Sequence, residues 1–227
     1  MHAKPASVLF DLDGTLIDTA PDFHWVINQL LQEEGRTRID FDFLRRYVSN
    51  GARAMIAAAF DLEEDDSDFP RLHQRMLEIY LEHLAVDSSL FPGLQDCLHW
   101  LQQHEIPWGV VTNKPERFTL PVMQGLAIDE QASSIICPDH VTHKKPHPES
   151  LLLACQQINC SPENSIYVGD HLRDIEAGKR AGMITIAATY GYIDEDEDPQ
   201  TWDADHYISC ATELKPLLKS LYSVLTP

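Results

Sequence analysis

Five short apolar runs, separated by helical patterns, limit most strongly the folds that this chain can adopt. They occupy residues 7–10, 108–111, 134–137, 165–168 and 184–187, and they are rich in β-branched and large apolar side chains. Such runs predict strands that are buried on both faces of a sheet. Strands that alternate with helices are typical of a doubly wound, Rossmann-like parallel sheet. The predicted fold class is therefore α/β.

The connection between the first and second runs breaks this alternation. Roughly ninety residues lie there, far more than an ordinary crossover needs, and they have helical periodicity without a convincing strand. The apolar positions fall on two helical stripes: Phe23, Val26, Ile27, Leu30 and Leu31, then Leu72, Met76, Ile79, Tyr80 and His83. We predict an inserted helical domain at residues 18–88, and an α/β core made of residues 1–17 and 89–227.

The net charge excludes some classes of partner. Lys and Arg number 17 against 36 Asp and Glu, which gives a formal net charge of −19. A chain this acidic is repelled by nucleic acid and by anionic membrane surfaces, so we expect neither as a partner. An anionic small-molecule substrate would meet the same repulsion and would need cations placed in its site.

Targeting signals and cysteine patterns indicate a cytoplasmic protein. The apolar run near the N-terminus is broken at Asp11 before it reaches the length of a signal-peptide core. No stretch approaches the roughly 18 apolar residues of a membrane span. The five cysteines are odd in number and include no Cys-x-x-Cys pair, so we expect reduced thiols rather than a disulfide framework. We expect a monomer or a homodimer.

Two carboxylates follow the first predicted strand directly. Asp11 and Asp13 lie two residues apart, and if the strand geometry continued, both side chains would point to the same side. By itself such a pair is more often a turn or a helix cap. In open α/β sheets, however, ligands bind beyond the carboxyl ends of the strands. The pair is therefore a candidate catalytic site if other strands bring partners to the same edge.

The other predicted strands bring such partners. Polar residues follow three of them: Thr112, Asn113 and Lys114 after the second, Lys145 after a loop beyond the third, and Asp170 and Asp174 after the fourth. Carboxylate oxygens are ligands that suit Mg²⁺, which binds through a few carboxylates together with substrate phosphate. One carboxylate can attack phosphorus, and a second can act as general acid and base. The pattern predicts phosphoryl transfer.

In this order, the four clusters resemble the motifs of the haloacid dehalogenase superfamily of phosphatases, and the resemblance spans nearly the whole chain. It implies that Asp11 is the nucleophile and a ligand of Mg²⁺. It implies that Asp13 is the general acid and base and binds the metal through its backbone carbonyl. Lys145 would stabilise the charge on the phosphoryl group, although the adjacent Lys144 competes for that role. The dehalogenase branch lacks an equivalent of Asp13, which argues against that branch.

The same resemblance assigns the remaining clusters. Thr112 and Asn113 would hydrogen-bond the phosphoryl oxygens. Asp170 would be a metal ligand, and Asp174 would bind the metal directly or through water. From the residues alone, Asp174 could also be an acid that favours the first turn of a helix. His171 stands where many relatives have an acidic or small polar residue. The resemblance therefore does not say which groups surround the metal ligands at this position.

The insertion resembles the type 1 helical cap, which closes over the active site of phosphatases in the phosphoglycolate phosphatase subgroup. Residues 49–55, 108–115, 137–141 and 189–193 resemble more narrowly the N-acetylmuramic acid 6-phosphate phosphatases of cell-wall recycling. The two labels overlap within this branch. The implied substrate is a small anionic phosphomonoester, and both named compounds carry a carboxylate beside the phosphate.

Three residues of the insertion are candidate substrate contacts. Arg53 follows the flexible pair Asn50 and Gly51, and its guanidinium could bind a substrate carboxylate or phosphate through two parallel hydrogen bonds. The alternative is an ordinary solvated helix residue.

Two other functions remain open at this point. A sugar phosphomutase of the same fold would pass the phosphoryl group to a sugar instead of water. A phospho-accepting signalling domain also gathers Asp, Thr and Lys around Mg²⁺, but such domains are shorter and have no long helical insertion.

Overall fold

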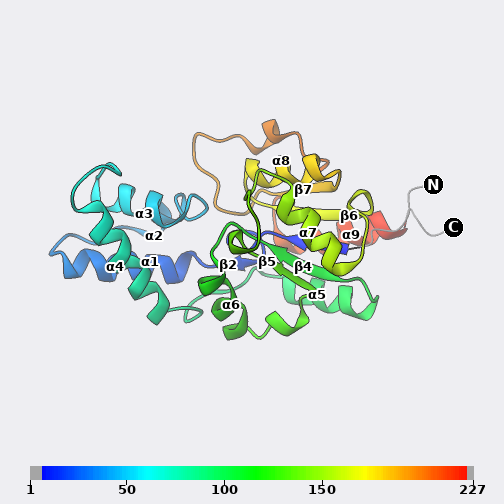
Figure 1. The fold of residues 1–227 in the computed structure, drawn as a ribbon, viewed down its shortest axis with the longest axis horizontal. Helices are drawn as coiled ribbons and strands as arrows, with labels where there is room; N and C mark the ends of the chain where they lie inside the picture. Colours follow the sequence, from blue (N-terminus) through cyan, green and yellow to red (C-terminus); the bar gives the residue numbers. More distant parts are fainter. Residues whose placement is uncertain (1–6, 224–227) are drawn as a thin grey trace.

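The computed structural model describes residues 7–223, and the ends of the predicted core, residues 1–6 and 224–227, lie outside this range. Figure 1 shows an elongated molecule with a sheet at one end and a group of helices at the other. The strands of the main sheet are β1 (Ser7–Phe10), β4 (Trp108–Val111), β5 (Ser134–Ile136), β6 (Ser165–Gly169), β7 (Ile184–Ala188) and β8 (His206–Ile208). The helices beside it are α5 (Leu94–Gln103), α6 (Glu116–Gly125), α7 (Glu149–Ile158), α8 (Leu172–Ala181) and α9 (Leu214–Ser223).

The sheet confirms the predicted doubly wound α/β fold. Its strands run in the order β5-β4-β1-β6-β7-β8, and all neighbouring pairs are parallel. β1 lies in the middle, with β4 on one side and β6 on the other. The five predicted runs are the first five of these strands in chain order. The sixth, β8, was not predicted, because three residues carry too short a pattern to be recognised.

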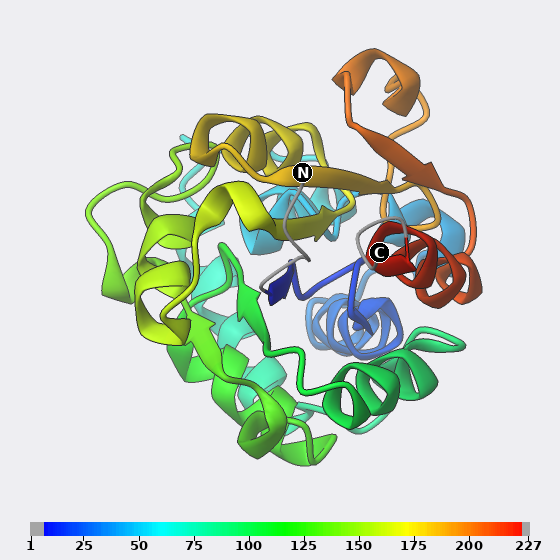
Figure 2. The same ribbon diagram turned by 90° about the vertical axis from the view of Figure 1, so that its right-hand side faces the viewer.

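Helices cover both faces of this sheet (Figure 2). α7 and α8 pack together on one face, while α5 and α9 pack together on the other, where α6 also lies. Every residue of β1, β4 and β6 is buried, as strands with helices on both sides must be. α8 ends at Gly182, whose φ of 78° is a left-handed conformation that glycine adopts without strain.

The insertion contains four helices, and two very short strands lie at its boundaries with the core. The helices are α1 (Ala20–Glu33), α2 (Phe41–Arg45), α3 (Gly51–Phe60) and α4 (Phe69–Glu82). β2 (Ile17–Asp18) and β3 (Ser89–Leu90) pair antiparallel where the insertion leaves and rejoins the core. The expectation of no strand here was wrong, because a two-residue strand has no periodicity and its partner is far away in the sequence. His83 lies at the end of α4 and not within it. The division into residues 18–88 and a core of 1–17 with 89–227 stays a prediction.

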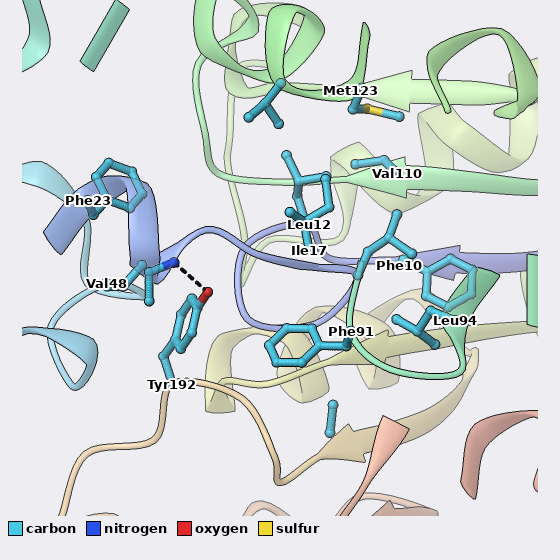
Figure 3. Close-up of a cluster of buried hydrophobic side chains, with 14 of the residues drawn as sticks. Phe10, Leu12, Ile17, Phe23, Val48, Phe91, Leu94, Val110, Met123 and Tyr192 are labelled. Carbon is cyan, nitrogen blue, oxygen red and sulfur yellow. Dashed lines mark hydrogen bonds between the residues drawn. The ribbon is translucent and has the colours of Figure 1, made fainter. Parts of the chain in front are cut away.

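One apolar cluster runs from the sheet into the insertion (Figure 3). Its labelled members include residues of the sheet and α5, of the segment around β2, and of the insertion: Phe10 and Leu94, then Leu12 and Ile17, then Phe23 and Val48. In the insertion, the ring of Phe23 stacks on that of Tyr80 at 4.2 Å between centroids. Buried contacts therefore hold the insertion over the carboxyl ends of the strands. Within residues 7–223, no helix has both the length and the apolar character needed to cross a bilayer.

Candidate active site

Asp11 and Asp13 lie where β1 ends, at the centre of the sheet and between β4 and β6. This is the point at which the strand order reverses, where open α/β sheets bind their ligands. The chain turns sharply at Gly14, which has a φ of 86°. A Cβ atom there would lie 2.1 Å from Oδ2 of Asp170. Only glycine lets this turn approach the carboxylate so closely.

Three buried carboxylates meet at this point. Oxygens of Asp11, Asp170 and Asp174 lie within 4.8 Å of one another. Burial, together with the negative charges of the neighbouring Asp11 and Asp174, raises the pKa of Asp170 to about 7. Burial also raises the pKa of Asp11. Like charges this close are unfavourable unless a cation joins them. The all-oxygen donor set and the unfavourable charge fit a hard divalent cation such as Mg²⁺.

Lys145 is the cation that the chain itself supplies to these carboxylates. Its Nζ donates to Oδ1 of Asp11 at 2.7 Å and forms an ion pair with Oδ1 of Asp174 at 2.7 Å. It also donates to the carbonyl of Val111 and to the hydroxyl of Tyr167. Burial lowers the pKa of Lys145, but the two carboxylates outweigh this effect, so the pKa is raised above its usual value. Lys145 therefore stays charged next to Asp11.

Asp13 has a different set of partners. Its Oδ1 accepts a hydrogen bond from Thr19 at 2.6 Å and another from Nζ of Lys114 at 2.8 Å. Nζ of Lys114 also donates to the hydroxyl of Tyr80 on α4, at 2.7 Å. Lys114 thus joins Asp13 in the core to the insertion. The sequence placed Lys114 in the cluster after β4 but assigned it no role, because nothing local indicates which carboxylate it reaches.

Thr112 and Asn113 lie beside this group on the loop that follows β4. The hydroxyl of Thr112 accepts from the backbone N–H of Lys114 at 3.1 Å. The side-chain amide of Asn113 makes two bonds, each of 3.1 Å, to the backbone N–H and carbonyl of Lys145. In this structure Asn113 positions the Lys145 loop, and its role toward a phosphoryl group stays a prediction.

His171 and Asp174 begin α8. Nδ1 of His171 accepts from the backbone N–H of Arg173 at 3.2 Å, and the carboxylate of Asp174 accepts from the backbone N–H of His171 at 3.1 Å. This reciprocal pattern satisfies N–H groups at the start of the helix. Burial, together with the positive charge of Arg173, lowers the pKa of His171 to about 4. His171 is therefore a neutral helix cap, while Asp174 combines its capping bond with the ion pair to Lys145.

The insertion touches the carboxylate group through Ser49, which the sequence analysis did not single out. The hydroxyl of Ser49 donates to Oδ2 of Asp170 at 3.0 Å, and the guanidinium of Arg173 donates to the carbonyl of Ser49. The only feature of the sequence that could have indicated a role for Ser49 was its place in the stretch 49–55, which resembles one branch of phosphatases. A residue of the insertion thus contacts a predicted metal ligand directly.

A pocket of about 380 Å³ lies between the insertion and the core. Asp11, Asp13, Thr112 and Asn113 line it from the core, and Asn50, Gly51 and Arg53 line it from the insertion. Lys145, Asp170 and Asp174 do not line this pocket. Lys145 forms ion pairs with Asp11, which does line it, and with Asp174. The guanidinium of Arg53 is 54% exposed and pairs with Glu64 at 2.5 Å. The structure therefore brings the predicted core residues together and places the predicted contacts of the insertion on the opposite wall.

Comparison with known proteins identifies what this architecture is similar to. Residues 8–188 match the family model of the haloacid dehalogenase-like hydrolases. An N-acetylmuramic acid 6-phosphate phosphatase of Pseudomonas putida is 44% identical over 94% of this chain and 96% of its own length. A phosphoglycolate phosphatase of Xanthomonas campestris is 40% identical over 88% of this chain and 90% of its own. A crystal structure described as a predicted phosphoglycolate phosphatase from Haemophilus somnus superposes with a TM-score of 0.81 at 26% identity, covering 93% of this chain and 97% of that one.

Proposed function

The chain belongs to the haloacid dehalogenase-like hydrolase family and is a phosphatase of that family, and from this premise we propose that it hydrolyses a small anionic phosphomonoester with the help of Mg²⁺ through an aspartyl-phosphate. One observation carries the proposal. Asp11 and Asp13 line the same pocket, yet one is held by Lys145 and the other by Lys114 and Thr19. Two neighbouring carboxylates in different surroundings suit two different roles.

In the first step, a carboxylate oxygen of Asp11 attacks phosphorus. A bond forms between that oxygen and phosphorus, and the bond from phosphorus to the ester oxygen breaks. Asp13 gives its proton to the departing alkoxide, which leaves as an alcohol. Both hydrogen bonds to Asp13 end on Oδ1, so Oδ2 is the oxygen available to carry this proton. Lys145 stays beside Asp11 and stabilises the negative charge of the transferred group.

In the second step, water hydrolyses the aspartyl-phosphate. Asp13, now a carboxylate, takes a proton from the water as the water oxygen bonds to phosphorus. The bond between phosphorus and Asp11 breaks, which releases phosphate and restores the carboxylate. Asn113 keeps the Lys145 loop in place through its two bonds to the backbone of Lys145.

Asp11, Asp170, Asp174 and the backbone carbonyl of Asp13 are the groups proposed to hold the metal. When bound, Mg²⁺ neutralises these carboxylates and screens the charge of the phosphate dianion. Ser49 and the backbone N–H of Tyr192 donate to Oδ2 of Asp170, at 3.0 and 2.9 Å. These bonds fix the orientation of the carboxylate before a metal arrives, as bonds to metal ligands commonly do.

For the substrate, we favour N-acetylmuramic acid 6-phosphate. The relative from Pseudomonas putida carries that name and is similar along nearly its whole length. The pocket volume of about 380 Å³ falls within the range of roughly 300–1,000 Å³ that is common for sites enclosing larger ligands. A phosphorylated amino sugar would use this space, whereas the two-carbon phosphoglycolate would leave much of it to water.

Replacing the nucleophile tests the proposal. We expect Asp11→Asn to release no free phosphate from N-acetylmuramic acid 6-phosphate or from phosphoglycolate while keeping a cooperative thermal transition, because an amide does not attack phosphorus. Asp96→Asn on α5, an exposed acid outside the pocket, is the control and should keep full activity. Full turnover by Asp11→Asn would contradict the assignment. Isomerisation of a sugar phosphate without release of phosphate would instead identify a phosphomutase.

A further inference from the structure

The pocket is cationic although the protein is strongly acidic. Of the residues that line it, five are Lys or Arg and only two, Asp11 and Asp13, are carboxylates; the cations are Arg53, Lys114, Arg117, Lys144 and Arg173. The whole chain has a net charge of −19. Cations gathered this way offset the repulsion that the rest of the molecule exerts on an anion. The question is what each of them can bind.

Two of these cations are occupied by the core of the site. Lys114 binds Asp13 and Tyr80, and Arg173 binds the carbonyl of Ser49. Two others, Arg53 on α3 and Arg117 on α6, have their contacts elsewhere. Arg53 pairs with Glu64, and the guanidinium of Arg117 lies 4.6 Å from the centre of the Phe118 ring.

His73 on α4 lines the same pocket as these two arginines. The ring of His73 is stacked with the ring of Phe69, with 6.3 Å between their centroids. The guanidinium of Arg53 lies 5.3 Å from the centre of the Phe69 ring. Burial lowers the pKa of His73, and the positive charges of both Arg53 and Arg117 lower it further, while Glu64 opposes them. Arg53, His73 and Arg117 therefore line one pocket, and none of them is hydrogen-bonded to Asp11, whose partner is Lys145.

We propose that Arg53, His73 and Arg117 form a second anion subsite, which binds a carboxylate of the substrate while its phosphate lies against Asp11. This inference rests on the proposed phosphatase function and assigns the residues that would bind the acid of its substrate, a phosphomonoester that also carries a carboxylic acid on a sugar-sized body. N-acetylmuramic acid 6-phosphate has that chemistry, because its lactyl group bears the acid. The apolar side chains of Val48, Leu77 and Phe118 line the same pocket and provide a surface for the body of such a substrate.

Glu64 indicates what Arg53 can bind. Its carboxylate already accepts a hydrogen bond from the guanidinium at 2.5 Å, and that bond lowers the pKa of Glu64. Both side chains are more than half exposed, at 54% and 61%. Solvent screens such a pair, so one carboxylate can replace the other at little cost. The substrate acid takes the place of Glu64 and gains Arg117 and His73 as further donors.

Two substrates that differ only in the acid provide the test. N-acetylglucosamine 6-phosphate lacks the lactyl group of N-acetylmuramic acid 6-phosphate, and p-nitrophenyl phosphate reports on the phosphoryl centre alone. We expect Arg53→Ala combined with Arg117→Ala to lower kcat/KM for the acid-bearing sugar by about 10- to 100-fold, the effect of losing hydrogen bonds to a charged group. Its kcat/KM for the other two esters should fall much less, because they lose only the general attraction of two pocket cations.

Two further variants separate an effect on substrate recognition from an effect on folding: one is a control, and the other is expected to improve binding. Arg71→Ala removes an exposed arginine of α4 that binds Glu34, outside the pocket, and should leave all three substrates unaffected. Glu64→Gln removes the competing carboxylate and should lower KM for the acid-bearing sugar alone. A gain of this kind does not arise from a merely structural role.

The outcomes distinguish the two levels of the proposal. Equal losses on all three esters in the double variant, or equal kcat/KM of the unaltered enzyme for both sugars, would overturn the anion subsite and leave the phosphatase function standing. Failure of the unaltered enzyme to release phosphate from any of the three esters would refute the proposed function itself.

Discussion

The two walls of the pocket are built differently. On the core side, behind the pocket-lining Asp11, Lys145 is 2% exposed and Asp174 is fully buried, and each of them has several polar partners. On the wall formed by the insertion, Arg53 is more than half exposed and has one charged partner, Glu64. Buried charges require fixed partners, because an unpaired one is costly. Exposed charges can exchange partners, because water takes their place.

This difference separates the roles of the two walls. The core wall can hold only one arrangement of its charges, which suits a reaction that is the same for every ester. The exposed contacts of the insertion, such as that of Arg53 with Glu64, can change without disturbing the buried charges of the core, which suits recognition of the rest of the substrate. Lys114, which binds both Asp13 and Tyr80, and Tyr192, whose hydroxyl holds the start of α1, are two of the groups that cross the boundary between core and insertion. The following predictions break the core wall first and then these two connections.

Removing divalent metal should have the largest effect. Treatment with a chelator is expected to reduce phosphate release to the background rate on every ester, because Asp11, Asp170 and Asp174 are left with Lys145 as the cation among them. Adding Mg²⁺ back should restore turnover and raise the Tm with increasing concentration. The measurements are a phosphate-release assay and thermal unfolding on the same sample. Undiminished turnover in the chelated enzyme would contradict the metal assignment.

Replacing Lys114 should have an intermediate effect. Lys114→Met removes the ammonium that holds Oδ1 of Asp13 and the hydroxyl of Tyr80. We expect kcat to fall by about 10- to 100-fold on acid-bearing and acid-free esters alike, since a misplaced general acid slows both steps. Lys219→Met, an exposed lysine of α9, is the control. A loss confined to the acid-bearing sugar would place Lys114 in substrate recognition instead.

Removing the hydroxyl of Tyr192 should have the smallest effect on turnover. In Figure 3 this hydroxyl points at the backbone where the insertion begins, and it accepts from the N–H groups of Thr19 and Ala20 at 2.7 and 3.0 Å. Tyr192→Phe removes this acceptor from the buried N–H of Thr19 and leaves the N–H of Ala20 with a longer bond to Oδ1 of Asp18, at 3.3 Å, which costs roughly 1–3 kcal/mol of unfolding free energy. We expect the Tm to fall by roughly 2–4 °C for each kcal/mol lost.

Phosphate release by Tyr192→Phe at 25 °C should decrease only a few-fold, because the residues at the reacting centre are unchanged. Tyr47→Phe, on the segment between α2 and α3, serves as the matched control. If the Tm of Tyr192→Phe equals that of the unaltered protein, the hydroxyl does not hold the insertion in place.

Much of the core could be predicted from the sequence, for reasons visible in particular residues. The runs that became β1, β4, β5, β6 and β7 are continuous apolar segments, and such segments have few arrangements other than a covered parallel sheet. Because the carboxyl ends of parallel strands meet at one edge, Asp11, Lys145, Asp170 and Asp174 could be expected to converge before any contact was known. Gly182 ended its helix for an equally local reason, since it adopts a left-handed conformation.

The remaining features depended on where the insertion packs. The pairing of β2 with β3, the bond from Ser49 to Asp170 and the link from Lys114 to Tyr80 each join segments that are far apart in the sequence. No local pattern records such partners, because they are set by the apolar cluster that runs from the sheet into the insertion. The sequence by itself determined the fold class and the chemistry of the core wall. The tertiary structure alone decided which side chains face that chemistry, because only packing brings Arg53 and His73 of the insertion into one pocket with Arg117 of α6.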